Sequence, residues 1–190
     1  MQHYFGSIQN GVVALPEEER HHLLHVKRAE IGEKIEIGDG ENVYLCRVDS
    51  LDPLRLSVLE NAASPRELSA NVTLAFGVLK GDHNEFIVQK GTELGVSTFV
   101  PFLSARTVVK PKEAEDAKLV RLRRVAQESA KQCRRGKIPS VSPYCSLDSL
   151  LNRKEELKLF AYESEALHGI PLIHALKGRA FSSVLVVVGP

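Results

Sequence analysis

The sequence predicts an α/β protein in which a small β-rich unit precedes a larger domain built on a parallel sheet. In the second part, nearly continuous apolar segments alternate with helical segments, a pattern typical of strands that are buried on both faces. Residues 1–60 instead alternate apolar and polar positions and contain hairpin turns. These patterns predict two domains, residues 1–68 and 71–190, which meet in the loop-like segment NAASPRELSA.

In the N-terminal domain, strands are expected over residues 3–8 and 12–15, on either side of the turn Asn10-Gly11. Pro16 then opens a helix over residues 17–28, because proline is favoured at the first helical position and acidic residues suit the positive end of a helix. Three further strands, which would complete a meander or small barrel, are KIEIG, NVYLCRV and LRLSVLE.

In the C-terminal domain, the strand VTLAFGVL precedes a helix that is expected to begin at Asp82 and to end at Gly95. Asp82 and Glu85 have the spacing of a capping box, in which each side chain accepts a bond from a backbone N–H at the helix start. A long helix is expected from about Lys112 to Arg135. The remaining strands are STFVPFL, LKLFAY and SSVLVVV, with short helices near Ser146 and over PLIHAL.

The long helix concentrates positive charge. Residues 103–137 hold eleven Lys or Arg and four acidic residues, about +7 in total, so the rest of the chain carries about −6 of the net +1. The apolar stripe of this helix comprises Leu119, Leu122, Ala126, Ser129, Ala130 and Cys133. Its other side carries Arg121, Arg123, Arg124, Lys131, Arg134 and Arg135. This basic side predicts either a solvated surface or a binding site for an anion such as RNA phosphate.

Composition narrows the class of protein. We expect a soluble cytoplasmic protein, because the sequence has neither a membrane-length apolar run nor the layout of a secretion signal. Its three cysteines show no CxxC spacing, which predicts reduced thiols rather than disulfides or zinc. His21, His22 and His25 have a spacing that can hold a metal, but no acidic or thiol ligand accompanies them. We therefore expect a packing helix and no metal.

The usual nucleotide-binding and hydrolase motifs, GxGxxG, GxxxxGK[ST] and GxSxG, are absent from the sequence. The remaining glycine signal is Gly189-Pro190, directly after the final apolar strand. Loops at the carboxyl ends of parallel strands are where such sheets bind ligands. Because a buried strand would otherwise finish in a free carboxylate at this place, we expect the polypeptide to continue.

Four segments and one series of residues fit a known family in combination. They are HHLLHVKRAEIGEKIEIGDG, LKGDHNEFIVQKGTELGV, FVPFLSARTVV and VVVGP, with Arg121, Glu128, Gln132, Arg135 and Pro139. Together they resemble the RsmE-type 16S ribosomal RNA uridine-N3 methyltransferases of the SPOUT superfamily, over nearly the whole chain.

The resemblance implies a PUA-like RNA-binding β-barrel followed by a SPOUT α/β domain, which forms a trefoil knot when complete and works as a homodimer. Members use S-adenosylmethionine to methylate N3 of a uridine in 16S ribosomal RNA of the small subunit. Three family loops hold the cofactor: one follows the strand that matches LKLFAYE, the second begins G-P-E-G-G, and the third contains L-G-x-x-I-L-R-x-E-T-A. Here the second is cut after Pro190 and the third is absent. We therefore expect that this chain lacks its C-terminal segment and does not bind the cofactor normally.

The resemblance and the chemistry of methyl transfer assign roles to particular residues. Cations beside the base would stabilise negative charge on the uracil, and we expect Arg106 and Arg135 to be catalytic in this sense. The expected cofactor-binding residues are Tyr162, Glu163, Gly189 and Pro190. The expected RNA-binding residues are Arg28, Lys80, Lys90, Arg121, Arg124 and Arg134, with Lys80, Lys90 and Glu93 also organising the site.

Other interpretations stay open at this point. Each charged residue has a structural alternative, such as pairing of Glu93 with Lys90 or Arg106, and of Glu128 with Arg124 or Arg121. A non-catalytic RNA-binding or ribosome-assembly protein would use the same barrel and basic helix. An enzyme acting on a small phosphorylated metabolite would use the basic residues as an anion pocket.

Overall fold

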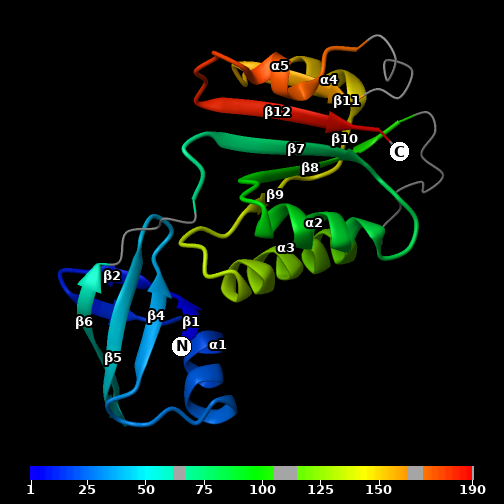
Figure 1. Ribbon diagram of the computed structural model, residues 1–190. Coiled ribbons are helices and arrows are strands. Elements are labelled where there is room, and N and C mark those ends of the chain that lie inside the picture. The colour runs from blue at the N-terminus through cyan, green and yellow to red at the C-terminus, as the bar shows by residue number, and fades with distance from the viewer. Residues whose placement is uncertain (62–66, 105–114, 162–168, 190) are drawn as a thin grey trace. The chain divides into compact units, whose positions relative to one another are not determined.

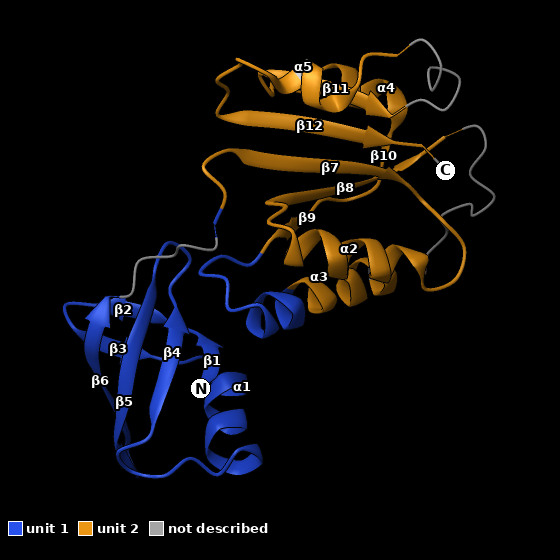
Figure 2. Cartoon of the chain, in the orientation of Figure 1, with its two compact units in different colours: residues 1–67, 127–138 blue, residues 68–126, 139–190 orange. Residues whose placement is uncertain are grey.

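The structure is a computed structural model that describes residues 1–61, 67–104, 115–161 and 169–189 (Figure 1). The chain forms two compact units (Figure 2). The first unit contains residues 1–67 and 127–138, and the second contains residues 68–126 and 139–190. Helix α3 (Glu115–Gln132) crosses this boundary, so its last residues belong to the first unit. No helix in the described ranges is long and apolar enough to cross a membrane.

The first unit is a mixed, curled sheet in the order β1-β4-β5-β6-β3-β2 (Figure 1). Strand β1 runs parallel to β4, and every other pair is antiparallel. The core residues include Tyr4, Leu23, Ile35, Ile37, Cys46 and Val48. The strands are β1 (Gln2–Phe5), β2 (Ser7–Gln9), β3 (Val12–Ala14), β4 (Lys34–Gly38), β5 (Val43–Leu51) and β6 (Leu54–Asn61).

Two local predictions for this unit are confirmed, the second with a change. Asn10 and Gly11 join β2 to β3 with φ of 52° and 78°, the paired positive values that a two-residue hairpin turn requires. The helix after Pro16 begins as α1 (Glu17–His21) but continues as the π-helix η1 (His22–Val26). In η1 the N–H of Lys27 donates to the carbonyl of His22, five residues back.

The second unit contains the predicted parallel sheet. Its order is β10-β8-β7-β12-β11, with β9 also paired to β8, and all of its strand pairs are parallel. The strands are β7 (Asn71–Gly77), β8 (Thr98–Leu103), β9 (Ser140–Val141), β10 (Cys145–Ser146), β11 (Leu157–Ala161) and β12 (Ser183–Val188).

Helices cover both faces of this sheet, as the continuous apolar strands predicted. Helices α2 (His83–Glu93) and α3 bury one face through Val88, Leu122 and Ala126, together with Phe76 and Phe99 of the strands. Helix α4 (Leu147–Leu151) places Leu150 against the other face, and α5 (Leu172–Leu176) leads toward β12. The predicted stripe of α3 is confirmed, since five of its six members are buried and Cys133 is half-buried.

The predicted capping box is wrong. Asp82 is the residue at the N-cap of α2, but its side chain accepts no capping hydrogen bond. The side-chain amide of Asn84 makes the ordering contacts instead, with the backbone of Leu79. Two hydrogen bonds to the preceding loop thus take the place of the reciprocal bonds predicted at the helix start.

Candidate functional site

The carboxyl ends of the strands form one edge of the second unit's sheet. Val188 is in register with Phe76 of β7 and with Ala161 of β11. These three neighbouring strands therefore end at the same level of the sheet. Gly189 directly follows β12, and a Cβ built on it would have no heavy atom of the described residues within 4 Å, apart from those of its chain neighbours. Val188 is 40% exposed beside it. This edge therefore offers open, partly apolar surface at the place where parallel sheets bind ligands.

The loop after β7 is fixed by Asn84. The N–H of Leu79 donates to Oδ1 of Asn84 over 2.9 Å, and Nδ2 of Asn84 donates to the carbonyl of Leu79 over 2.7 Å. Gly81 lies between them with φ of 69°, a value that glycine adopts without strain. The two hydrogen bonds of the Asn84 side chain hold the segment that carries Lys80. The position of the Lys80 backbone is therefore set by the fold.

A cavity of about 220 Å³ opens beside this loop, between α2 and α3. Three cations line it, Lys80 from the loop and Lys118 and Arg121 from α3, together with one acid, Glu85. Nη2 of Arg121 lies 2.7 Å from Oε2 of Glu85. The four charged groups therefore sum to about +2 at neutral pH, which favours an anionic ligand.

Two of the other predicted RNA-binding residues lie elsewhere in the second unit. Nζ of Lys90 donates to both carboxylate oxygens of Glu93 over 3.0 and 2.8 Å, which is the structural pairing left open above. Arg124 is exposed on α3, three residues beyond Arg121. Neither residue lines the cavity that Lys80 and Arg121 share.

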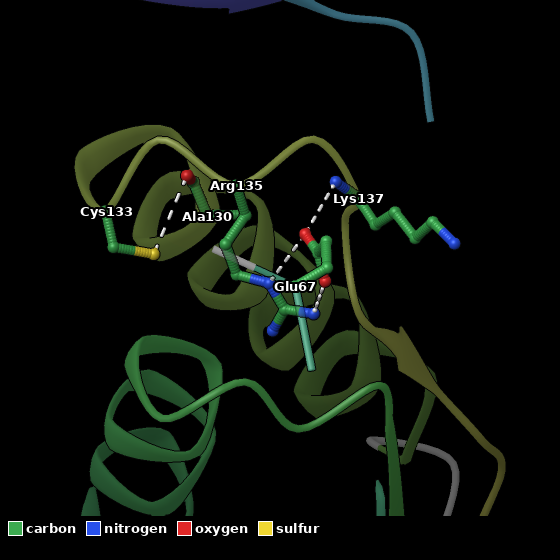
Figure 3. Close-up of polar contacts among 5 residues, drawn as sticks. All are labelled: Glu67, Ala130, Cys133, Arg135 and Lys137. Atoms are coloured by element: carbon green, nitrogen blue, oxygen red, sulfur yellow. Dashed lines mark hydrogen bonds and ion pairs between the residues drawn. The ribbon is translucent and has the colours of Figure 1, made fainter. Parts of the chain in front are cut away.

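Arg135, predicted to be catalytic, is buried in the first unit. Its guanidinium makes a two-point contact with Glu67, with Nε to Oε1 at 3.2 Å and Nη2 to Oε2 at 2.7 Å (Figure 3). The Arg135 side chain is 2% exposed, and Glu67 also accepts from the backbone N–H of Lys137. These contacts favour a structural role for Arg135, because a substrate would first have to open this pair.

Two further cations, one in the last turn of α3 and one just after it, contact acidic side chains of the first unit. Lys131 pairs with Glu19, whose carboxylate is 3% exposed. Nε of Arg134 lies 3.8 Å from Glu36, and Nη2 of Arg134 donates to the carbonyl of Met1 over 3.3 Å. Arg134 was predicted to contact RNA. In this structure it contacts protein groups, with its side chain 39% exposed.

The structure describes few contacts, or none, for the remaining predicted site residues. Arg28 is exposed just after η1, with φ of 52°. Arg106, Tyr162, Glu163 and Pro190 lie outside the described residues. Within the described ranges, no group of three or more His, Cys, Asp or Glu side chains is placed to hold a metal ion. The rings of His21 and His25 lie 4.9 Å apart on the N-terminal helix.

The shifted pKa values belong to groups away from the cavity and the sheet edge. Burial raises the pKa of the Cys46 thiol to about 11. Burial, with the nearby carboxylates of Glu33 and Glu19, raises the pKa of Tyr4 to about 12. Burial alone would raise the pKa of Asp39, but hydrogen bonds from the backbone N–H groups of Asn42 and Glu41 outweigh it and lower that pKa. We assign no catalytic role to these groups.

Sequence reasoning missed Lys118 and Asn84 and gave Glu85 another role. Lys118 was counted only within the basic segment, because periodicity alone does not say which cation of a helix faces a loop. Asn84 lies three residues after Gly81, and asparagine side chains commonly bond to nearby backbone in turns. That preference was the available signal for its contact with Leu79.

Comparisons with known proteins match both units. Residues 66–190 match the family described as RNA methyltransferase domain, and residues 15–60 match the RNA methyltransferase PUA domain. Ribosomal RNA small subunit methyltransferase E of Bacillus subtilis is 37% identical over 186 residues, which cover 91% of this chain and 71% of that protein. The protein of the same name from Mycobacterium tuberculosis is 30% identical over 190 residues, covering 95% of this chain and 71% of its own.

Solved structures agree on the fold. A crystal structure of a hypothetical protein has a TM-score of 0.86 and 32% identity, and the match covers all of this chain and 80% of that one. Ribosomal RNA small subunit methyltransferase E from Neisseria gonorrhoeae, bound to S-adenosyl methionine, has a TM-score of 0.83 at 23% identity, covering all of this chain and 79% of that one. The predicted combination of a PUA-like domain and a SPOUT-type parallel-sheet domain is thereby confirmed. The predicted β-barrel is a curled mixed sheet, since among the described residues its end strands β1 and β2 do not pair with each other.

Proposed function

The chain belongs to the family of ribosomal RNA small subunit methyltransferase E, and from this premise we propose that it methylates N3 of a uridine in 16S ribosomal RNA, with S-adenosylmethionine as the methyl donor. One observation carries the proposal: the Bacillus subtilis relative aligns over 91% of the chain. The atom N3 and the uridine come from the resemblance given above.

The carboxyl edge of the second unit's sheet is the proposed cofactor site. S-adenosylmethionine supplies a methyl group already activated on a sulfonium, so the protein has mainly to position the two reactants. Gly189 follows β12 at this edge, with room around its Cα and apolar surface on Val188. These features fit the adenosine part of the cofactor. Tyr162, Glu163 and Pro190 are proposed as further cofactor contacts from the resemblance alone.

Uracil loses its weakly acidic N3 proton on methylation, so cations near the ring would stabilise the negative charge that develops there. Arg106 remains our candidate for this role. For Arg135, the buried contact with Glu67 supports a structural role in place of the predicted catalytic one.

RNA contacts are proposed for exposed cations of both units. Lys80 and Arg121 are supported by the cationic cavity that they line. Arg28 and Arg124 are supported by their exposure. Lys90 and Arg134 have carboxylate partners in this structure and would have to exchange them for phosphates. The first unit would also bind RNA, because the resemblance implies that the PUA-like domain is RNA-binding.

We further propose that the protein works in the cytoplasm as a homodimer on the small ribosomal subunit, as the family resemblance implies. Sedimentation of the full-length protein at micromolar concentration would test the dimer. A monomer at that concentration would contradict it.

The alternative is a non-catalytic RNA-binding or ribosome-assembly protein, which would need the basic surfaces but no methyl donor. Calorimetric titration of S-adenosylmethionine into the full-length protein separates the two. The proposed enzyme should give saturable binding with one site per chain, which the product S-adenosylhomocysteine prevents. RNA binding without any heat from the cofactor would favour the alternative.

A further inference from the structure

The cationic cavity of the second unit, lined by Lys80, Lys118, Arg121 and Glu85, has no assigned ligand. We propose that it binds a backbone phosphate of the RNA substrate, with Lys118 as its third and previously unassigned cation. The inference rests on the proposed function, because it takes RNA as the substrate. It adds a defined phosphate subsite to that function.

The first argument is the charge inside the cavity. Among the residues whose side chains the structure describes, which leaves out 62–66, 105–116, 162–168, 175 and 190, neither Lys80 nor Lys118 forms an ion pair. The one carboxylate that lines the cavity, Glu85, is occupied by Arg121 at 2.7 Å. Among the described side chains, these two ammonium groups therefore have no carboxylate partner, and concave cationic sites raise the local concentration of anions.

The second argument is the orientation of Arg121. Its side chain is 67% exposed, and an arginine so exposed would ordinarily sample many rotamers, but the contact with Glu85 fixes one end of the guanidinium. A guanidinium has five N–H donors, and the contact with Glu85 leaves several of them for a second acceptor. A phosphate suits such a fork, because it can accept two parallel hydrogen bonds.

The third argument is that the other cations come from rigid elements. Lys118 and Arg121 are one turn apart on α3, whose Leu119 and Leu122 are buried in the core. Lys80 is carried by the loop that the Asn84 amide fixes to Leu79. A subsite built in this way is preorganised, so RNA would bind without first ordering the loop.

The backbone of the loop adds weaker support. Within the part of the chain that the structure describes, the N–H groups of Lys80, Gly81 and Asp82 donate to no protein acceptor. They lie at the N-terminal end of α2, where the helix dipole also favours an anion. A phosphate held by the three cations would therefore meet further donors.

A carboxylate is the main competing anion, because S-adenosylmethionine carries one on its methionine part. RNA and S-adenosylmethionine differ in the number of anionic groups that they bring and in how strongly their affinity depends on salt. RNA bound through several phosphates loses affinity steeply with salt, whereas one carboxylate gives a shallow dependence. The cavity lies beside α3, which is part of the segment 103–137 that carries about +7, and this location favours RNA.

The test uses Lys118→Gln and Lys80→Gln in the full-length protein, with Lys154→Gln as the matched control. Lys154 is exposed in the same unit and loses the same charge, but it lies outside this cavity. Binding to 16S ribosomal RNA is measured by filter retention between about 50 and 200 mM salt, where phosphate contacts dominate. Calorimetry with S-adenosylmethionine is run on each variant.

Each cavity variant should weaken RNA binding roughly fivefold at the lower salt and reduce the salt slope by about 0.7–0.9, the loss of one phosphate contact. Cofactor affinity should stay within about twofold of wild type, and Lys154→Gln should match wild type. Equal RNA affinities for Lys118→Gln and Lys154→Gln would overturn the subsite and leave the proposed function intact. Weakened cofactor binding by Lys118→Gln would overturn it in favour of the carboxylate. A wild-type protein that binds neither ligand would overturn both.

Discussion

Arg135 and Glu67 form a buried ion pair within the first unit, with two hydrogen bonds between guanidinium and carboxylate (Figure 3). Their side chains are 2% and 16% exposed. Glu67 lies in the segment between the two predicted domains, and Arg135 follows the end of α3. The pair therefore ties the end of the long helix to the linker from which the second unit begins.

Glu67→Ala should lower the free energy of unfolding by about 3 kcal/mol, because it removes the carboxylate that makes two hydrogen bonds with the buried Arg135 guanidinium. Urea denaturation followed by circular dichroism measures the change. Glu93→Ala is the control, since it breaks the half-exposed pair with Lys90 and should cost under about 1 kcal/mol. Equal losses for the two variants would contradict the structural role of Arg135.

Asn84→Ala should loosen the loop that carries Lys80. It removes two hydrogen bonds to Leu79, so we expect a loss of about 1–2 kcal/mol and roughly tenfold faster hydrogen exchange at the Leu79 amide. His83→Ala, at the neighbouring exposed position, should leave that exchange rate unchanged. An unchanged rate in Asn84→Ala would show that the amide does not hold the loop.

Cys46 should resist alkylation in the folded protein. It is fully buried, and burial raises the pKa of its thiol to about 11, so little thiolate forms at pH 8. Cys133 and Cys145 are half-buried, and both should react with iodoacetamide before Cys46. Peptide mass spectrometry gives the order of labelling. Labelling of Cys46 as fast as Cys145 in native buffer would contradict the buried environment.

Asp39 should contribute to acid lability. Its folded pKa is lowered, so its contribution is fully present above the unfolded pKa of about 4 and is lost as pH falls through the folded value. Asp39→Asn keeps an oxygen that can accept from Glu41 and Asn42 but removes the titration. The variant should therefore lose less stability than wild type between about pH 5 and 3.

Glu60→Gln is the control for that comparison, because Glu60 is exposed on β6 of the same unit. Its stability should follow the wild-type pH dependence. If the stability of Asp39→Asn also followed the wild-type pH dependence, the hydrogen bonds to Asp39 would not be a source of acid lability.

Most of the fold followed from hydrophobic pattern and turn chemistry. The apolar runs from Val72 and Ser182 predicted strands that became the adjacent β7 and β12, and Asn10-Gly11 predicted a hairpin that formed. These signals are local, so one sequence is enough to read them. The π-helical turn over His22–Val26 was not predicted, because a hydrophobic pattern over five residues does not distinguish a π turn from a turn of α-helix.

The site was less predictable, because its contacts join segments far apart in the sequence. The basic side of α3 was evident, yet its members have different surroundings: Arg121 faces a cavity, whereas Arg135 is buried against Glu67. Periodicity gives the face of a helix but not the acids that meet it. Gly189 was expected at a ligand-binding edge from the rule for parallel sheets, and the register of β7, β11 and β12 aligns the strand ends there.

The most direct test of the central claim is methyl transfer to small ribosomal subunits that lack the modification. The full-length protein is incubated with these subunits and S-adenosylmethionine carrying a deuterated methyl group, and the digested nucleosides of 16S ribosomal RNA are identified by mass spectrometry. The account predicts labelled 3-methyluridine, and none when the cofactor is omitted. A labelled methyl group on another nucleoside would contradict the account. So would unlabelled RNA after incubation with a protein that binds both S-adenosylmethionine and the RNA.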